Sequence, residues 1–201
     1  MNKKQRKSKL IFELKRKSIH ILASIYILIY WISFSWFGHQ IAMLILLSTL
    51  ILFIVIDFFR IREHRKIPII HLLWRKTENN CLGGQVYFML GVIIAFGLFE
   101  FKIAVAAILM TTIGDMAAAI FGVAFGKHKI SKNSKKSWEG TSAEFVVDLI
   151  IAFLILQNPL VAIAMALTAT VVETTFSHID DNLAIPVFSG FIAQCLKLVF
   201  P

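Results

Sequence analysis

The sequence predicts an all-α membrane protein, a polytopic helix bundle with about seven transmembrane helices and a cytoplasmic N-terminus. Hydrophobic residues make up 58% of the 201-residue chain, and charged residues only 16%. Soluble domains carry about 25% charged residues, so this composition excludes an ordinary soluble fold. Long apolar runs and three clusters of basic residues between them support the same class, an integral, multi-pass membrane protein.

Seven apolar runs are candidates for membrane spans. They cover residues 19–37, 40–59, 85–99, 103–125, 143–157, 159–173 and 183–200. A transmembrane helix needs about 20 mainly apolar residues, and three of the runs fall short of that length. Six spans plus a re-entrant segment are therefore an alternative to seven.

The basic residues predict the orientation of the bundle. Of the 21 lysines and arginines, eight lie in residues 1–17, six in 60–76 and five in 127–136. With seven spans these three stretches lie on one side of the membrane, and the positive-inside rule makes that side the cytoplasm. Attraction to anionic lipid headgroups accounts for the net charge of +9, so no nucleic-acid partner is expected. The small size favours a prokaryotic plasma membrane.

The chain divides into a short surface segment and one membrane domain. Residues 1–18 mix eight cations with apolar residues, which is typical of a basic amphipathic segment on the cytoplasmic leaflet. We expect residues 19–201 to form a single transmembrane catalytic domain. Within it, residues 67–74 are apolar but too short to cross the membrane, which indicates an interfacial or re-entrant segment.

The fourth candidate span contains both a small-residue stripe and a charge. Its small residues recur at a spacing of four, at Gly114, Ala118, Gly122 and Gly126. Such a stripe allows another helix to approach closely. Asp115 lies beside the stripe, and a charge at the bilayer centre costs about 2.5–3.5 kcal/mol on insertion scales. We therefore expect Asp115 to point into the bundle.

Local signals predict where the next helices begin. Thr141 to Glu144 match a capping box, which would start the fifth span there. Asn158-Pro159 is a turn and start signal for the sixth span. At the end of the second span, Asp57 is expected to pair with Arg60 or Arg62.

Acidic and basic side chains gather on the predicted cytoplasmic side. Phosphoryl transfer needs both kinds of group, because cations neutralise phosphate oxygens and carboxylates hold Mg²⁺. The start of the fifth helix also offers free N–H groups to an anion. The acidic set consists of Asp115, Glu139, Glu144, Asp148, Glu173, Asp180 and Asp181. The basic set consists of Arg16, Lys17 and the lysines of 127–136. This pattern predicts a nucleotide polyphosphate site at the membrane surface.

Each member also has a simpler interpretation. The lysine-rich loop is more often a determinant of topology than a phosphate site. Glu144 is equally explained as a capping residue, Glu173 as the solvated end of a span, and His20 as an interfacial histidine. Capping does not explain Asp148, and buried acids in spans are functional by default, so Asp115 and Asp148 are the best functional candidates.

Four blocks of the sequence resemble the polyprenol kinase family, which includes dolichol kinase, phytol kinase and CTP-dependent diacylglycerol kinase. The blocks are ELKRKSIHILAS (13–24), GDMAAAIFGVAFGK (114–127), KKSWEGTSAEF (135–145) and VETTFSHIDDNLAIPVFSG (172–190). They follow the order of the family pattern and extend over nearly the whole chain. The second and third blocks are the most specific.

The resemblance implies that the γ-phosphate of CTP is transferred to a membrane lipid alcohol with Mg²⁺. It implies catalytic roles for Asp115, Glu139, Glu173 and Asp181 and metal binding by Asp115, and the charge pattern adds Glu144 and Asp148 as metal candidates. The residues implied in nucleotide or substrate binding are Arg16, Lys17, His20, Gly126, Lys127, Lys136, Ser137, Gly140 and Asn182, and the charge pattern adds Lys135. Among these, Lys127, Lys135 and Lys136 are expected to bind the triphosphate, and Asp115 to bind Mg²⁺ or accept the hydroxyl proton.

Two other functions remain open at this point. Lipid cytidylyltransferases carry similar motifs and use CTP to make a CDP-activated lipid. A non-enzymatic membrane carrier would also place acids inside the membrane, although the inverted repeats or broken helices typical of carriers are not evident in the sequence.

Overall fold

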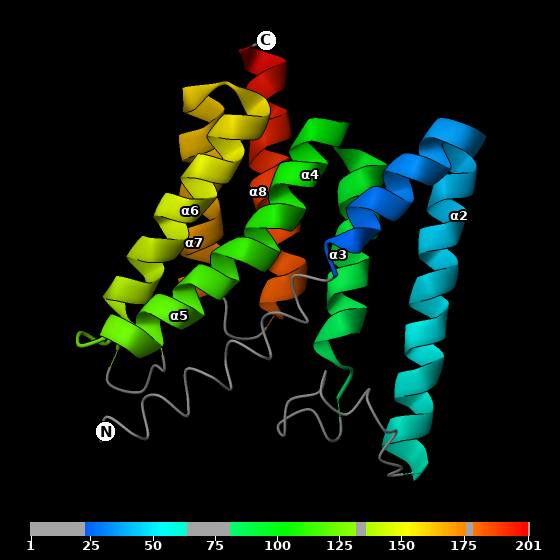
Figure 1. Cartoon of the computed structure of the whole chain (residues 1–201), viewed down its shortest axis with the longest axis horizontal. Helices are drawn as coiled ribbons and strands as arrows, with labels where there is room; N and C mark the ends of the chain where they lie inside the picture. The colour runs from blue at the N-terminus through cyan, green and yellow to red at the C-terminus, as the bar shows by residue number, and fades with distance from the viewer. Residues whose placement is uncertain (1–22, 64–80, 132–135, 176–178, 201) are drawn as a thin grey trace.

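The computed structural model describes residues 23–63, 81–131, 136–175 and 179–200, and most of these residues are helical. The elements are α2 (Ile25–Glu63), α3 (Gly84–Leu98), α4 (Phe101–Leu109), the π-helical turn η3 (Met110–Gly114), α5 (Asp115–Phe125), α6 (Trp138–Leu156), α7 (Pro159–Thr175) and α8 (Asp181–Val199) (Figure 1). Within these ranges the β-structure is limited to one isolated bridge, between Lys129 and Ser137. The predicted all-α class is confirmed.

The helices surround α4. Helix α5 packs on α6, α6 on α7, α7 on α8, α8 on α3, and α3 on α2, while α4 contacts α3, α6 and α8. The central place of α4 explains why five of its apolar residues are fully buried, namely Ile103, Ala104, Ala106, Ala107 and Ile108. Helix α2 lies at the edge of the bundle (Figure 1).

The outer surface of the bundle is apolar. Three helical stretches are long and apolar enough to cross a membrane, at Ile25–Arg62, Phe101–Phe125 and Asp181–Val199. Large apolar side chains such as Leu44, Leu154 and Leu167 are at least half exposed. Soluble monomeric proteins rarely expose apolar surface over so large an area. These features are those of a membrane protein. The count of seven spans and the cytoplasmic N-terminus stay predictions.

Helix α2 is two helical arms joined at Gly38. The Gly38 φ angle is +82°, which side chains other than glycine rarely adopt. Nothing lies within 4 Å of a Cβ built there, so the backbone angle rather than space requires glycine. The two arms of α2 run in opposite directions in Figure 1. They correspond to the apolar runs predicted at 19–37 and 40–59.

The small-residue stripe of α5 faces α6. A Cβ added to Gly140 of α6 would lie 2.7 Å from the carbonyl oxygen of Ala118 and 3.2 Å from the Cα of Gly122. No side chain fits at that distance, so the two helices meet backbone to backbone. The prediction of a close helix approach along this stripe is confirmed.

The start of α6 differs from the sequence prediction. The helix begins at Trp138, and the Ser137 hydroxyl caps it by accepting the Gly140 N–H at 3.3 Å. The capping box at Thr141–Glu144 is therefore wrong, because Ser137 supplies an earlier cap. Glu144 lies inside the helix and is fully buried. The start of α7 is as predicted, since the Asn158 side-chain oxygen accepts the N–H groups of the following turn.

A buried polar network joins the end of α2 to the start of α3. The Asp57 carboxylate accepts hydrogen bonds from Arg60 Nε at 3.0 Å, Gly83 N at 2.6 Å and Gln85 Nε2 at 3.2 Å. Asp57 is fully buried and Arg60 is 8% exposed. The predicted pairing of Asp57 with Arg60 is confirmed, and the role of the pair is to connect two helices.

Candidate active site

Five carboxylates, here called the acid cluster, gather between α5, α6, α7 and α8. They are Asp115 at the start of α5, Glu144 and Asp148 in α6, Glu173 near the end of α7 and Asp181 at the start of α8. The charged neighbours of Glu144 are Glu173, Asp148 and Asp115. Those of Asp181 are Lys136, Glu173 and Asp115. Residues up to 66 positions apart in the sequence thus meet in one place. Of the predicted acidic set, Glu139 instead bonds Lys127 and His128, and Asp180 caps α8.

The inner members of the acid cluster are buried, and most of their carboxylate oxygens have no hydrogen-bond partner in the described part of the chain. Glu144 and Asp148 are 0% exposed and Glu173 is 6% exposed. Both carboxylate oxygens of Glu144 and of Asp148, and Oε2 of Glu173, have no hydrogen-bond partner in the described part of the chain. A buried polar atom without a partner costs about 1–3 kcal/mol, and more if charged. A ligand that supplies a cation or hydrogen-bond donors to these oxygens would remove that cost.

The backbone of η3 approaches this cluster closely. A Cβ added to Gly114 would overlap the carboxylate of Asp148. Gly114 is the last residue of η3 and directly precedes Asp115. Glycine at this position therefore lets the Asp148 carboxylate lie against the chain beside Asp115.

Lys136 supplies a cation to the acid cluster. Its ammonium lies 3.3 Å from Glu173 Oε1 and 3.3 Å from Asp181 Oδ2, and it also donates to the backbone oxygen of Glu173. Burial lowers the pKa of Lys136, but attraction by Glu173 and Asp181 and hydrogen bonds to them outweigh burial, so the pKa is raised above its usual value. Lys136 therefore stays charged and ties the segment before α6 to α7 and α8.

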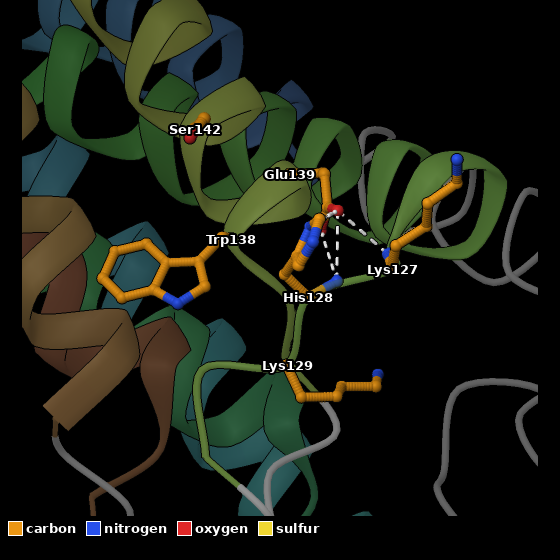
Figure 2. A pocket seen from close by; sticks show the side chains of 6 residues that line it. All are labelled: Lys127, His128, Lys129, Trp138, Glu139 and Ser142. Carbon is orange, nitrogen blue, oxygen red and sulfur yellow. Dashed lines mark hydrogen bonds and ion pairs between the residues drawn. The ribbon is translucent and has the colours of Figure 1, made fainter.

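A second group of residues lines an open pocket of about 860 Å³ at the start of α6. Its lining is Lys127, His128, Lys129, Trp138, Glu139 and Ser142 (Figure 2). Residues 126–131 lie beside residues 136–138, and these two stretches are here called the lysine hairpin: His128 O accepts the N–H of Trp138 at 3.0 Å, and Lys136 O accepts that of Ile130 at 3.3 Å. In Figure 2, Trp138 lies on one side of the pocket and the His128–Glu139 pair on the other.

Glu139 holds the turn that follows α5. Its Oε1 accepts the backbone N–H of Lys127 at 3.0 Å and that of His128 at 3.1 Å, and lies 2.9 Å from His128 Nδ1. Hydrogen bonds from the Lys127 and Glu139 backbones and from His128 lower the pKa of Glu139 to about 2. Glu139 is thus an ionised anchor of the lysine hairpin, on the pocket side of α6.

The other predicted site residues have varied surroundings. Ser137 is 2% exposed and Asn182 is 5% exposed. Gly126 packs tightly, since a Cβ there would overlap the carbonyl oxygen of Gly122, and Gly140 packs on α5. Arg16, Lys17, His20 and Lys135 lie outside the described residues. Ligand binding by all of these residues stays a prediction.

Sequence reasoning missed the π-helical turn η3 before Asp115. Two adjacent threonines, Thr111 and Thr112, were the available signal, because their hydroxyls can bond backbone carbonyls inside a helix. It also missed a close contact between α3 and α8, where a Cβ on Gly91 would lie 2.8 Å from Pro186 Cγ. Neither the π-helical turn nor the contact between α3 and α8 produces a hydrophobic pattern in the sequence from which it could be predicted.

The acid cluster fits Mg²⁺ only together with a phosphate ligand. In the described ranges, no three His, Cys, Asp or Glu side chains are arranged to hold a metal ion by themselves. Mg²⁺ usually takes one or two protein carboxylates and completes its shell with water and substrate phosphates. The unpartnered oxygens of Glu144 and Asp148 suit that mode of binding.

Comparison with known proteins identifies relatives of the chain. The model of the cytidylyltransferase family matches residues 1–185. A probable chloroplastic phytol kinase of Zea mays is 25% identical over 208 residues, which cover 91% of this chain and 66% of that protein. The CTP-dependent diacylglycerol kinase 1 of Schizosaccharomyces pombe is 37% identical over 76 residues, 37% of this chain and 34% of that protein. The resemblance to lipid kinases is confirmed.

The chain spans 41% to 66% of the lengths of the plant phytol kinases that it matches. An uncharacterized protein of Rickettsia prowazekii is 29% identical over 207 residues and matches end to end, with 94% of this chain and 95% of that protein covered. No solved structure matches the chain.

Proposed function

The chain belongs to the cytidylyltransferase family, and from this premise we propose that it is a CTP-dependent lipid kinase. It transfers the γ-phosphate of CTP to the hydroxyl of a membrane lipid alcohol, a polyprenol, dolichol or phytol-like alcohol or a diacylglycerol. The relatives named phytol kinase and CTP-dependent diacylglycerol kinase support this reaction class. We further propose that the chain is a multi-pass protein whose active site faces the cytoplasm.

One observation carries this proposal, the contact between the acid cluster and Lys136. Phosphoryl transfer depends mostly on positioning and on stabilising charge on the transferred group. Buried carboxylates without partners and a charged lysine 3.3 Å from Glu173 provide groups for both a metal and phosphate oxygens. The lysine hairpin places further cations next to them.

We assign roles to the residues around this contact. Lys127, Lys135 and Lys136 bind the triphosphate. Asp115, beside Asp148 at the start of α5, receives the proton of the lipid hydroxyl or shares in holding the metal with Glu144 and Asp148. When bound, Mg²⁺ supplies charge neutralisation at the β- and γ-phosphates. Glu173 and Asp181 hold Lys136 in place and bring it towards the reacting groups.

The lipid hydroxyl reaches the cluster from within the bilayer. Helix α5, which begins at Asp115, buries only Ala117 among its residues and exposes Phe121 and Phe125 to the membrane. The side of the bundle at α5 would thus be open to a lipid whose hydroxyl reaches Asp115. CTP enters from the side of the lysine hairpin.

The test uses the purified chain in lipid nanodiscs with CTP labelled at either the α- or the γ-phosphate. A panel of farnesol, a longer prenol, phytol and diacylglycerol is supplied, with ATP in parallel, and the lipids are extracted. We expect label in the lipid from γ-labelled CTP alone, with CDP as co-product. Label transferred from ATP as efficiently as from CTP would refute the proposal that CTP is the phosphate donor. Absence of labelled lipid would refute the proposal that the chain is a lipid kinase.

A lipid cytidylyltransferase is the second candidate, because the matching family model bears that description. That reaction joins the CMP unit of CTP to a lipid phosphate and releases pyrophosphate. In the same experiment, with phosphatidic acid or a prenyl phosphate added, α-labelled CTP would label the lipid and pyrophosphate would accumulate. Solute flux into liposomes without nucleotide would instead favour a carrier.

A further inference from the structure

The turn η3 interrupts what is otherwise one continuous helix from α4 to α5. Its residues Met110, Thr111, Thr112 and Gly114 are buried. A π-helical turn contains one more residue than an α-helical turn and shifts the backbone hydrogen bonds, so it is rare and often found at functional sites. Here it ends directly at Asp115.

Threonine hydroxyls stabilise the backbone at this turn. Thr111 Oγ1 donates to Ala107 O at 2.8 Å, and Thr112 Oγ1 lies 3.2 Å from both Ile108 O and Leu109 O. These carbonyls lie in the last turn of α4, directly before the π-helical turn. Thr112 is fully buried, so water does not replace its hydroxyl.

Thr112 also connects this turn to α2. Its Oγ1 lies 3.1 Å from the hydroxyl of Ser24, which precedes the first turn of α2. Thr112 therefore bonds two carbonyls of α4 and a side chain 88 positions away in the sequence. A valine at this position would keep the shape and lose all of these bonds.

The extra residue determines which way Asp115 faces. Successive residues of an α-helix are about 100° apart around the axis. If the turn returned to α-helical bonding, Asp115 and Gly114 would rotate by about that angle relative to α4. Gly114 would then leave its close contact with the Asp148 carboxylate, and Asp115 would leave the acid cluster.

We infer that the π-helical turn Met110–Gly114, held by the Thr112 hydroxyl, places Asp115 in the acid cluster, and that Thr112 is a positioning residue for the phosphoryl transfer. The catalytic part of this inference rests on the proposed kinase function. The placement of Asp115 does not.

The kinetic test compares Thr112→Val with Thr112→Ser. We expect Thr112→Val to lower kcat about tenfold or more, because small displacements of catalytic groups have effects of this size. KM for CTP should change little, and Thr112→Ser should keep the wild-type rate. Thr168→Val is the matched control, since Thr168 Oγ1 donates to Ala164 O at 2.8 Å in the regular helix α7. Equal kcat in Thr112→Val and wild type, or equal losses in the two valine variants, would overturn the inference.

A second measurement needs no enzymatic activity. Asp115→Cys and Asp148→Cys are combined in a chain with Cys81→Ser and Cys195→Ser, and disulfide formation in nanodiscs is followed with a mild oxidant. We expect the disulfide to form with Thr112 present and its yield to fall when Thr112→Val is added, but not Thr168→Val. No disulfide with Thr112 present, or an equal yield with Thr112→Val, would refute the placement. Absence of lipid phosphorylation by the wild type would refute the proposed function alone.

Discussion

The Lys136 ammonium lies 3.3 Å from the Glu173 carboxylate, and so joins the segment before α6 to the end of α7. A second contact of the same length, to Asp181, adds the start of α8. Carboxylates that are buried together repel one another, and Lys136 faces two of them, Glu173 and Asp181. This lysine of the sequence KKSWEG thus offsets part of the repulsion in the acid cluster.

Removing this cation is expected to destabilise the bundle. Lys136→Met would leave Glu173, 6% exposed, without its counter-ion. We expect the free energy of unfolding to fall by about 1–3 kcal/mol, less than for a fully buried pair because Lys136 is partly exposed. Denaturant unfolding in detergent micelles measures the change. Lys197→Met is the control, because its pair with Glu100 is 41% and 48% exposed, and an equal loss in both variants would contradict the prediction.

Neutralising Glu139 is expected to weaken CTP binding. Glu139→Gln removes the charge that holds the backbone of Lys127 and His128, so KM for CTP should rise about tenfold. Glu100→Gln, a change of the same kind in the exposed pair with Lys197, should leave it unaltered. A CTP KM that is the same in Glu139→Gln and wild type would show that this anchor does not matter for the nucleotide.

The pH dependence of this anchor follows from the depressed pKa of Glu139. Its ordinary value is 4.5 and its value in the folded chain is about 2. The ionised carboxylate therefore stabilises the lysine hairpin above pH 4.5, and this contribution is lost as the pH falls from 4.5 towards 2. Between about pH 5 and pH 8, Glu139 should not titrate. A wild-type CTP KM that changes in this range and is flat in Glu139→Gln would contradict this.

Removing the inner acids is expected to separate stability from activity. Asp148→Asn and Glu144→Gln keep the shape of the side chains and remove charge from a buried site without polar partners. Stability should stay the same or rise by about 0.5–2 kcal/mol, as is common when a strained functional site is relieved. Lipid phosphorylation should fall at least about tenfold. Unfolding curves and turnover are measured on the same samples, and a large loss of stability would show that these acids serve structure.

Adding a side-chain atom at the contact between α5 and α6 is expected to lower the stability of the bundle. Gly140→Ala would place a Cβ 2.7 Å from the carbonyl oxygen of Ala118, and overpacking of this kind typically costs about 1–3 kcal/mol. At Gly97 of α3 the nearest atom to an added Cβ is Met43 Cε at 3.4 Å, so Gly97→Ala should be tolerated. The midpoint of thermal unfolding distinguishes the two, and equal midpoints would mean that the helices can separate without cost.

Much of the fold could be predicted because apolar run length and small-residue spacing are local signals. The helices α3 and α7 begin within one residue of the predicted runs, and the stripe from Gly114 to Gly126 meets α6 as expected. The start of α6 could not be predicted correctly, because Ser137 and Thr141 are both good N-cap residues. In the structure Ser137 is the N-cap, and Gly140 in the first turn packs against α5.

The site could be predicted in composition but not in arrangement. Placing a charged residue in an apolar run costs free energy of membrane insertion, so such a residue usually has a role in packing or function. Asp115 and Asp148 can therefore be recognised in the sequence. Lys136 faces the acid cluster, while Glu139 bonds Lys127 and His128, and this difference depends on how the chain enters α6. The direction in which each of these side chains points depends on the packing of four helices and not on a local sequence pattern.

The turnover of Asp115→Asn beside that of Asp180→Asn tests the central claim most directly. Asp180 accepts the N–H of Asn182 as the N-cap of α8, and asparagine caps a helix about as well as aspartate. With γ-labelled CTP and the preferred lipid alcohol, we predict that Asp115→Asn loses about 10²-fold or more of the wild-type rate with an unchanged unfolding midpoint, while Asp180→Asn keeps it. Wild-type turnover in folded Asp115→Asn would contradict the assignment of the acid cluster as the site of phosphoryl transfer.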